Sequence, residues 1–157
     1  MLVLPEPIWL EIVEHIYAGL PNESCGLLAA ARVSSPDDAP LEIARFYPCG
    51  NDSDSALVYT LNPLDHLRAD RDAEERGLEI VGVVHSHTHS DAYPSPTDVR
   101  DAPDPAWHYP IVSLRDLEPV LRSYRIVDGT ITEEPVRLIG ANEGSALPIE
   151  GYTGLES

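Results

Sequence analysis

Two segments of the chain carry the residue pattern of α-helices. In residues 7–18, apolar side chains recur every three or four positions while Glu11 and Glu14 lie on the opposite side, and Gly19 ends the pattern. Residues 63–76 are rich in strong helix formers and are also followed by a glycine. The pattern therefore predicts an amphipathic helix near the N-terminus and a second helix near the middle of the chain.

Apolar and β-branched runs between Pro-, Gly-, Ser- and Asp-rich segments predict the β-strands. The run 78–84, LEIVGVV, is apolar almost throughout, as expected of a strand that is buried on both faces. Asp128 and Gly129 make a favourable hairpin turn between two later runs. Together with the helices, these strands predict an α/β fold with a mixed, curved sheet flanked by helices. The other predicted strands cover residues 24–33, 41–47, 57–60, 108–114, 119–129 and 130–139.

The chain is strongly acidic. Its 27 acidic and 10 basic residues give a formal net charge of −17, and the charges are spread along the sequence. The resulting field repels phosphate backbones and anionic lipids, so we expect neither a nucleic-acid partner nor a membrane partner. The charge permits a basic or neutral protein partner, and solubility alone explains it equally well.

Length and cysteine usage indicate a one-domain protein of a reducing compartment. A chain of 157 residues suits a single domain. Cys25 and Cys49 are too few and too far apart for a disulfide framework. No stretch resembles a secretory signal or reaches the roughly eighteen consecutive apolar residues of a membrane span. We expect a soluble, cytoplasmic protein with one domain over residues 1–140 and an irregular tail over residues 141–157. The sequence does not indicate an oligomeric state.

The densest group of potential metal ligands follows the apolar run 78–84. Residues two apart in an extended segment point to the same side, so His85 and His87 present two imidazoles on one face. Asp98 adds a carboxylate if the loop folds back, and the segment from Ser95 to Asp98 has the signature of a helix start. Two histidines and a carboxylate with an open fourth position match a catalytic zinc site. Taken singly, these residues are also explained by a solvated strand end and a helix cap.

In combination with a glutamate upstream, these residues resemble the JAMM (MPN+) metallopeptidase motif. That motif consists of a glutamate, then HSH, seven residues, and SxxD. The resemblance covers roughly residues 4–140, including the order of the predicted helices and strands. It implies the MPN (cytidine deaminase-like) architecture for the expected α/β fold. The matching parts in this chain are Glu23, His85-Ser86-His87, Ser95 and Asp98.

The resemblance implies a role for each of these side chains. His85, His87 and Asp98 would bind Zn²⁺ with a water in the fourth position. Glu23 would hold that water and pass its proton to the leaving amine, and Ser95 would donate a hydrogen bond to the oxyanion. The residue types suit these roles, because a carboxylate beside an activated water can act as acid and base. A hydroxyl group aimed at developing negative charge stabilises it.

The segment after the histidines resembles the bacterial branch of the family. Many relatives have a proline after HSH, whereas here Thr88 and His89 follow, and residues 92–95 read AYPS. That branch contains actinobacterial peptidases that release cysteine from the C-terminus of a small sulfur-carrier protein with a ubiquitin-like fold. The resemblance therefore implies a zinc-dependent hydrolase acting at the C-terminus of such a carrier, in cysteine biosynthesis. The short loop 88–94 leaves little room for the insertion that shapes ubiquitin-chain specificity, so polyubiquitin is a poor candidate substrate.

Other interpretations stay open from the sequence. A general deconjugating isopeptidase for ubiquitin-like modifiers would use the same residues, whereas the non-catalytic MPN scaffolds lose ligands that this chain keeps. A two-His-one-carboxylate iron site for oxygen chemistry fits the ligand set but requires neither Glu23 nor Ser95.

Two neighbouring residues also have alternative roles. Cys25 lies two residues after Glu23 and could be a nucleophile, although a cysteine in an apolar run is more often a small buried hydrophobe. His89 is expected in a loop rather than as a third imidazole ligand. A nucleoside deaminase is excluded because the HxE…PCxxC signature is absent from the sequence.

Overall fold

The structure, a computed structural model, describes residues 1–31, 39–140 and 146–147. Both predicted long helices are present, together with one short helix. The helices are α1 (Glu6–Gly19), α2 (Pro63–Glu75) and α3 (Pro96–Arg100). The strands are β1 (Leu2–Pro5), β2 (Cys25–Ala31), β3 (Leu41–Glu42), β4 (Arg45–Cys49), β5 (Leu78–His87), β6 (His108–Ser113), β7 (Val120–Val127), β8 (Thr130–Glu134), β9 (Val136–Ile139) and β10 (Ala146–Leu147).

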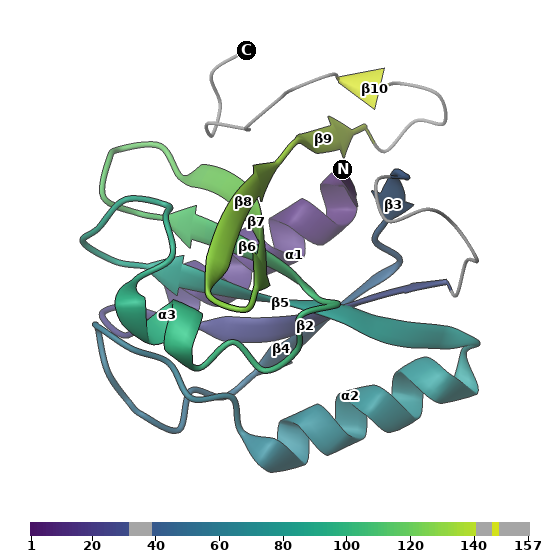
Figure 1. The fold of residues 1–157 in the computed structure, drawn as a ribbon, viewed down its shortest axis with the longest axis horizontal. Helices are drawn as coiled ribbons and strands as arrows, with labels where there is room; N and C mark the ends of the chain where they lie inside the picture. Colours follow the sequence, from purple (N-terminus) through teal and green to yellow (C-terminus); the bar gives the residue numbers. More distant parts are fainter. Residues whose placement is uncertain (32–38, 141–145, 148–157) are drawn as a thin grey trace.

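Strand β5 lies inside a six-stranded mixed sheet (Figure 1). The order is β4-β2-β5-β6-β7-β8, and only the β5–β6 pair is parallel. The expected α/β fold with a mixed sheet is confirmed. The predicted end of this strand at residue 84 is wrong, because β5 continues to His87. Partners on both sides extend it: His85 lies opposite Cys25 of β2, and His87 lies opposite Ser113 of β6.

Gly82 permits the close approach of β6 to β5. A Cβ atom at this position would lie 2.4 Å from the backbone oxygen of His108, which is far inside van der Waals contact. Any larger residue would push the two strands apart where they are paired. The parallel ladder that follows leads directly to the two histidines at the end of β5.

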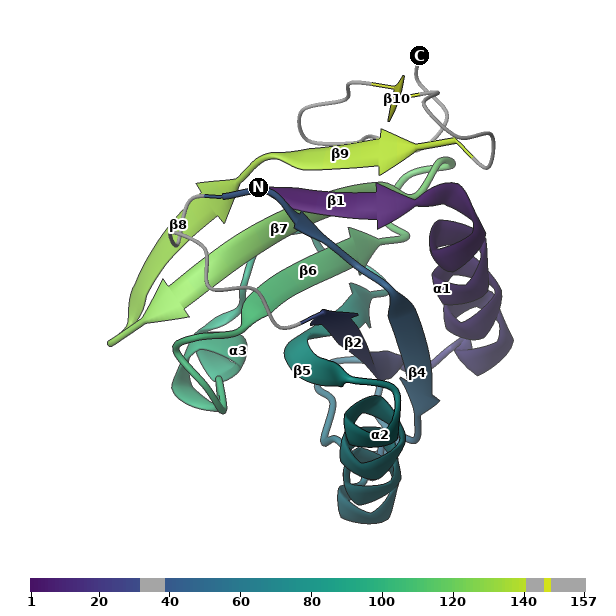
Figure 2. The same ribbon diagram turned by 90° about the vertical axis from the view of Figure 1, so that its right-hand side faces the viewer.

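The two long helices cover opposite faces of the large sheet. Alternate residues of a strand point to opposite faces, and Val84 packs in the cluster that contains α1, whereas Val83 packs with Ala69 of α2. Figure 2 shows the two helices on different sides of β4. His85 and His87 have the parity of Val83 and therefore belong to the α2 side. The buried face of α1 consists of Ile8, Trp9, Ile12 and Ile16.

A small second sheet, with the order β10-β9-β1-β3, was not predicted from the sequence. In it β1 lies parallel to β3 and β9 (Figure 2). The predicted strand 41–47 is divided between the two sheets as β3 and β4, and the predicted strand 130–139 is divided at Pro135 into β8 and β9. Proline has no N–H for a strand ladder, but the Pro135 carbonyl accepts a hydrogen bond from the Leu2 N–H at 2.9 Å.

Three local predictions have separate outcomes. The hairpin turn is confirmed, because Asp128 and Gly129 have φ angles of 49° and 78° between β7 and β8. The strand predicted at 57–60 is not formed, and this segment belongs to a loop. Most of the expected tail, residues 141–145 and 148–157, lies outside the described residues, while β10 pairs with β9. The domain boundary at residue 140 stays a prediction.

A buried hydrogen bond between a histidine of β6 and a carboxylate of β8 provides a test of the fold. His108 Nδ1 lies 2.7 Å from Glu134 Oε1, and both residues are buried. Glu134→Ala would leave His108 buried without this partner, so we expect a loss of about 3 kcal/mol in the free energy of unfolding, measured by urea denaturation. Glu133→Ala is the matched control: it removes an exposed ion pair with Arg122 and should cost less than about 1 kcal/mol. Equal losses in the two variants would contradict the assignment.

Candidate metal centre

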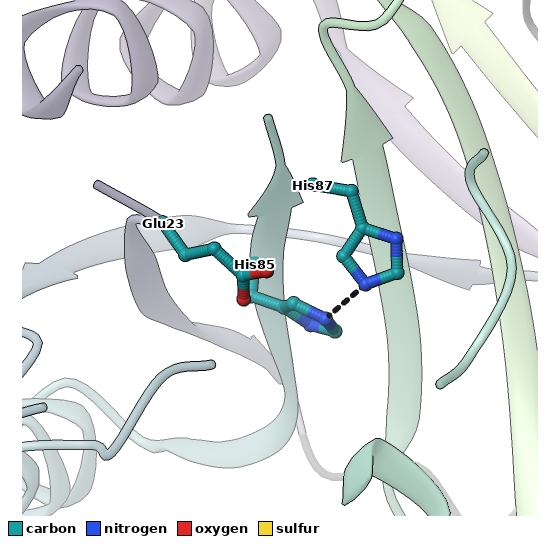
Figure 3. Close-up of side chains that lie close together, drawn as sticks. All are labelled: Glu23, His85 and His87. Carbon is teal, nitrogen blue, oxygen red and sulfur yellow. Dashed lines mark hydrogen bonds between the residues drawn. The ribbon is translucent and has the colours of Figure 1, made fainter. Parts of the chain in front are cut away.

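The last residues of β5 bring two imidazoles together. His85 and His87 are each 2% exposed, and their side chains leave the strand on the same face. Their Nε2 atoms lie 3.1 Å apart (Figure 3). The geometry follows the two-residue spacing that the sequence predicted, and the strand is fixed by pairing on both sides.

Asp98 reaches these imidazoles from α3. Its Oδ2 atom lies 3.2 Å from His85 Nε2 and 3.0 Å from His87 Nε2. The expected helix start is confirmed as a capping box: Ser95 Oγ accepts the Asp98 N–H at 3.0 Å, and the Ser95 N–H donates to Asp98 Oδ2 at 2.9 Å. Because Ser95 Oγ acts only as an acceptor here, its own proton remains available for donation. Capping and a second role for this hydroxyl are therefore compatible.

The two histidines are held by different contacts. His87 Nδ1 lies 2.7 Å from the Asp91 carbonyl oxygen and must donate to it, since a carbonyl only accepts. His85 Nδ1 has no hydrogen-bond partner in the described part of the chain, and its ring stacks on Tyr59 at 4.4 Å between centroids. Sequence reasoning missed both Asp91, which acts through its backbone, and Tyr59, which lies in a segment predicted to be a strand.

A positive charge among the members of this cluster would stabilise it. With Nδ1 of His87 protonated, a neutral imidazole would direct its Nε2 lone pair at the Asp98 carboxylate. Burial acts to raise the pKa of Asp98, but hydrogen bonds with His85 and His87 outweigh it and hold the pKa well below its usual range. Burial lowers the pKa of His85, which opposes protonation of that ring. A proton on His87 or a cation at the centre would relieve the repulsion.

The donor atoms fit a tetrahedral metal ion. Ligands at bond lengths of about 2.0–2.1 Å around tetrahedral zinc lie about 3.3 Å from one another. The three separations among His85 Nε2, His87 Nε2 and Asp98 Oδ2 are 3.0–3.2 Å. Two imidazole nitrogens and one carboxylate oxygen are also donors that zinc commonly takes. The arrangement can therefore hold a zinc ion with a fourth position free.

Glu23 lies beside the two imidazoles. One of its carboxylate oxygens and a ring nitrogen of each histidine lie within 4.8 Å of one another (Figure 3). The residue is 5% exposed, and its Oε1 atom has no hydrogen-bond partner among the described residues. Burial raises the pKa of this carboxyl to about 7, although the neighbouring His87 acts to lower it. A carboxyl group with such a pKa can take up and release protons near neutral pH.

The loop between β4 and α2 holds the backbone of Glu23. The Glu23 N–H donates to the Ser55 carbonyl at 2.7 Å, and Asn51 Nδ2 donates to the Glu23 carbonyl at 3.0 Å. Asn51 Oδ1 in turn accepts the N–H groups of Ser53 and Thr60. Sequence reasoning missed this function of Asn51. The available signal was an asparagine in a polar loop, where its side chain often organises the backbone.

Most of the chain matches one known protein family. Residues 5–127 match the profile of Prok-JAB, described as prokaryotic homologs of the JAB domain. The chain belongs to this family. The match covers the segments that carry Glu23, His85, His87, Ser95 and Asp98.

Individual relatives agree with this assignment. A CysO-cysteine peptidase of Mycobacterium tuberculosis (strain ATCC 25618 / H37Rv) is 40% identical over 140 residues, which are 88% of this chain and 92% of the relative. A probable TtuB-protein conjugate cleaving protease of Thermus thermophilus is 32% identical over 113 residues, 71% of this chain and 68% of the relative. The solution structure of a Desulfitobacterium hafniense protein has a TM-score of 0.81 at 33% identity and covers 91% of this chain and 96% of its own.

These relatives confirm that the chain is a hydrolase of the Prok-JAB family. They also confirm the resemblance drawn from the motif. The roles of the individual site residues stay predictions. Across the described ranges, no helix combines the length and the apolar character needed to cross a bilayer.

Two residues near the site, His89 and Cys25, have surroundings that bear on their alternative roles. His89 lies in a bend after β5 and is exposed, in agreement with the expected loop position. Cys25 is 1% exposed, and its thiol donates to the Gly50 carbonyl at 3.5 Å. Burial raises the pKa of both cysteine thiols, Cys25 and Cys49, to about 12. These surroundings disfavour the cysteine-nucleophile alternative, because the thiolate is the reactive form.

The reactivity of the two thiols tests this conclusion. At pH 8 a thiol with a pKa near 12 is ionised in only about one molecule in ten thousand, so iodoacetamide should leave Cys25 and Cys49 unmodified in the folded protein. Mass spectrometry should show two modifications after unfolding in urea. Rapid modification of Cys25 in the folded protein, with loss of activity and retention of metal, would restore the nucleophile alternative.

Proposed function

We propose that this protein is a zinc-dependent peptidase that releases cysteine from the C-terminus of a small sulfur-carrier protein with a ubiquitin-like fold. The observation that carries the proposal is the convergence of two buried imidazole nitrogens and a partly buried carboxylate oxygen, at 3.0–3.2 Å from one another, beside a buried carboxyl group with an unpartnered oxygen. A cytoplasmic location and a place in cysteine biosynthesis are part of the proposal.

His85, His87 and Asp98 would hold the zinc ion. The chemistry that zinc supplies when bound is to lower the pKa of a coordinated water from about 15.7 to about 7 and to polarise the scissile carbonyl. The protein's part is to keep the three donors deprotonated and fixed. Pairing of β5 fixes the histidines, and the capping box of α3 fixes the carboxylate.

Glu23 would act as general base and then as general acid. It would take a proton from the attacking water and deliver it to the nitrogen of the leaving amine. Its pKa, raised by burial to about 7, suits both steps better than that of an exposed carboxyl group. Its backbone is held by Ser55 and Asn51, so its carboxylate is directed at the site by a fixed loop.

Ser95 would stabilise the oxyanion that forms during hydrolysis. Its oxygen caps α3, and its proton is free to be donated to substrate. One such donor is typically worth about 10²–10³-fold in rate. The N–H groups of Ser95 and Asp98 are already used by the capping box, whereas the proton of the Ser95 hydroxyl is free for donation.

The relatives support the substrate class. The Mycobacterium tuberculosis relative is named a CysO-cysteine peptidase, and the Thermus relative is named a probable TtuB-protein conjugate cleaving protease. Leu57 and Tyr93 are exposed on the loops that carry the contacts of Glu23 and His87, and they offer apolar surface to an incoming tail. A general deconjugating isopeptidase is the second candidate, because the same site would cleave an isopeptide bond to lysine.

Metal content tests the ligand set. Mass spectrometry of protein purified without added metal should find about one zinc ion per chain, and Asp98→Ala should lose most of it. Asp101→Ala is the matched control, since Asp101 is an exposed residue at the end of α3 and should not change zinc content. Absence of zinc from the unmodified protein would contradict the proposal and favour the non-catalytic scaffold. Iron with O₂ consumption would favour the oxygenase.

Cleavage of a carrier-cysteine adduct tests the reaction and the base. The protein should release one cysteine per adduct, measured as a mass loss of the carrier. Glu23→Gln should keep zinc and lose about 10²–10⁴-fold in kcat, because the side chain keeps its shape but cannot accept the proton. Release from lysine-linked conjugates but not from the cysteine adduct would favour the general isopeptidase. A zinc-loaded protein that cleaves neither would refute both peptidase proposals.

A further inference from the structure

Three consecutive carbonyl groups of the loop between β5 and α3 are each fixed by a side chain. The Ser90 carbonyl accepts a hydrogen bond from Ser113 Oγ at 2.5 Å, and the Ala92 carbonyl accepts one from the Tyr124 hydroxyl. The carbonyl between them, that of Asp91, accepts from His87 Nδ1 at 2.7 Å. The loop is thus tied to β6 and β7 on either side of the group that contacts a proposed metal ligand.

The outer two contacts determine the orientation of the middle one. Each peptide unit is planar, so fixing the carbonyls of Ser90 and Ala92 restrains the peptide planes on both sides of the Asp91 carbonyl. The Asp91 carbonyl also accepts the Tyr93 N–H at 2.8 Å, which uses its second acceptor position. The direction of this oxygen toward His87 is therefore restrained by loop contacts other than that with the imidazole.

The donors that hold the loop are buried. Ser113 and Tyr124 are 3% and 2% exposed, and both belong to regular strands of the large sheet. The ion pair between Arg115 and the Asp91 side chain is different, because both side chains are more than half exposed. Exposed pairs of this kind contribute little, so the two hydroxyl groups are the main restraints on the loop.

We propose that Ser113 and Tyr124 are positioning residues that orient His87 for metal binding. By fixing the Asp91 carbonyl they keep the proton of His87 on Nδ1 and present the Nε2 lone pair to the cation. The inference rests on the proposed zinc site. His85 has no comparable partner on Nδ1 within the described residues, so the restraint is specific to one of the two histidines. Loss of contacts that orient a metal-bound histidine typically costs about 10–100-fold in metal affinity.

Two substitutions with matched controls test this role. Tyr124→Phe and Ser113→Ala each remove one hydroxyl that holds the loop. Tyr109→Phe also removes a buried tyrosine hydroxyl that donates to a backbone carbonyl, that of Asp104. Ser123→Ala removes a buried serine hydroxyl that contacts Glu134 away from the site. The controls account for the general cost of losing a buried hydrogen bond.

Three quantities are measured on the full zinc-loaded chain. Zinc affinity is measured by competition with a chelator. NMR of ¹⁵N-labelled protein measures the exchange of the His87 Nδ1 proton with water. The Tm reports thermal stability. We expect Tyr124→Phe and Ser113→Ala to weaken zinc binding by about 10-fold each and the double variant by up to about 100-fold. The Nδ1 proton should exchange faster in these variants, whereas the controls should change only the Tm.

The outcomes separate this inference from the proposed function. Unchanged zinc affinity and proton exchange in the double variant would overturn the positioning role while leaving the zinc site intact. Equal losses of zinc affinity in the controls would also overturn it, since they would reflect stability alone. Failure of the unmodified protein to bind zinc would instead refute the proposed function, and no cleavage assay is needed to distinguish these results.

Discussion

The placement of two buried imidazole nitrogens against one partly buried carboxylate oxygen is the constraint on which the site depends. Lone pairs and a negative charge this close together repel one another unless a positive charge lies among the three atoms. Burial keeps out the water that would otherwise screen this repulsion. The capping box, the paired end of β5 and the fixed loop at 90–92 all restrain these atoms. Without these restraints the three side chains would separate or take up protons.

Ser86, the residue between the histidines, connects this constraint to the general base. Its side chain points to the opposite face from the imidazoles, and its Oγ accepts the Ser24 N–H at 2.8 Å. Its own N–H donates to the Ser24 carbonyl at 2.9 Å. Ser24 directly follows Glu23, so the same strand that carries the metal ligands also fixes the start of the segment that carries the base. The middle serine of HSH therefore has a structural function.

The parts of the fold that local patterns determine could be predicted from the sequence. The two long helices, the buried strand and the Asp128-Gly129 turn each depend on periodicity or on the φ preferences of a few residues. The small sheet could not be predicted, because β1 and β3 are too short to be stable alone and depend on β9 at the other end of the chain. The division at Pro135 depends on the same distant pairing.

In the site, too, local patterns could be predicted from the sequence, whereas contacts between distant segments could not. The alternation within HSH and the helix-start signature at Ser95 predicted that His85, His87 and Asp98 could meet, and their side chains do lie together. The contacts that support them were not predictable from residue type. Asp91 acts through a carbonyl that every residue has, and Ser113 and Tyr124 lie on strands whose alignment with the loop follows only from the complete sheet.

Buried polar atoms without a hydrogen-bond partner are rare in proteins and can indicate a functional site. Among the described residues, four buried side-chain nitrogen or oxygen atoms lack a hydrogen-bond partner, and two of them, Glu23 Oε1 and His85 Nδ1, belong to the site. Leaving a buried polar group unpartnered costs about 1–3 kcal/mol. Because the two side chains lie beside each other, a cost of this kind at both is best explained by a function that needs Glu23 and His85 at this place.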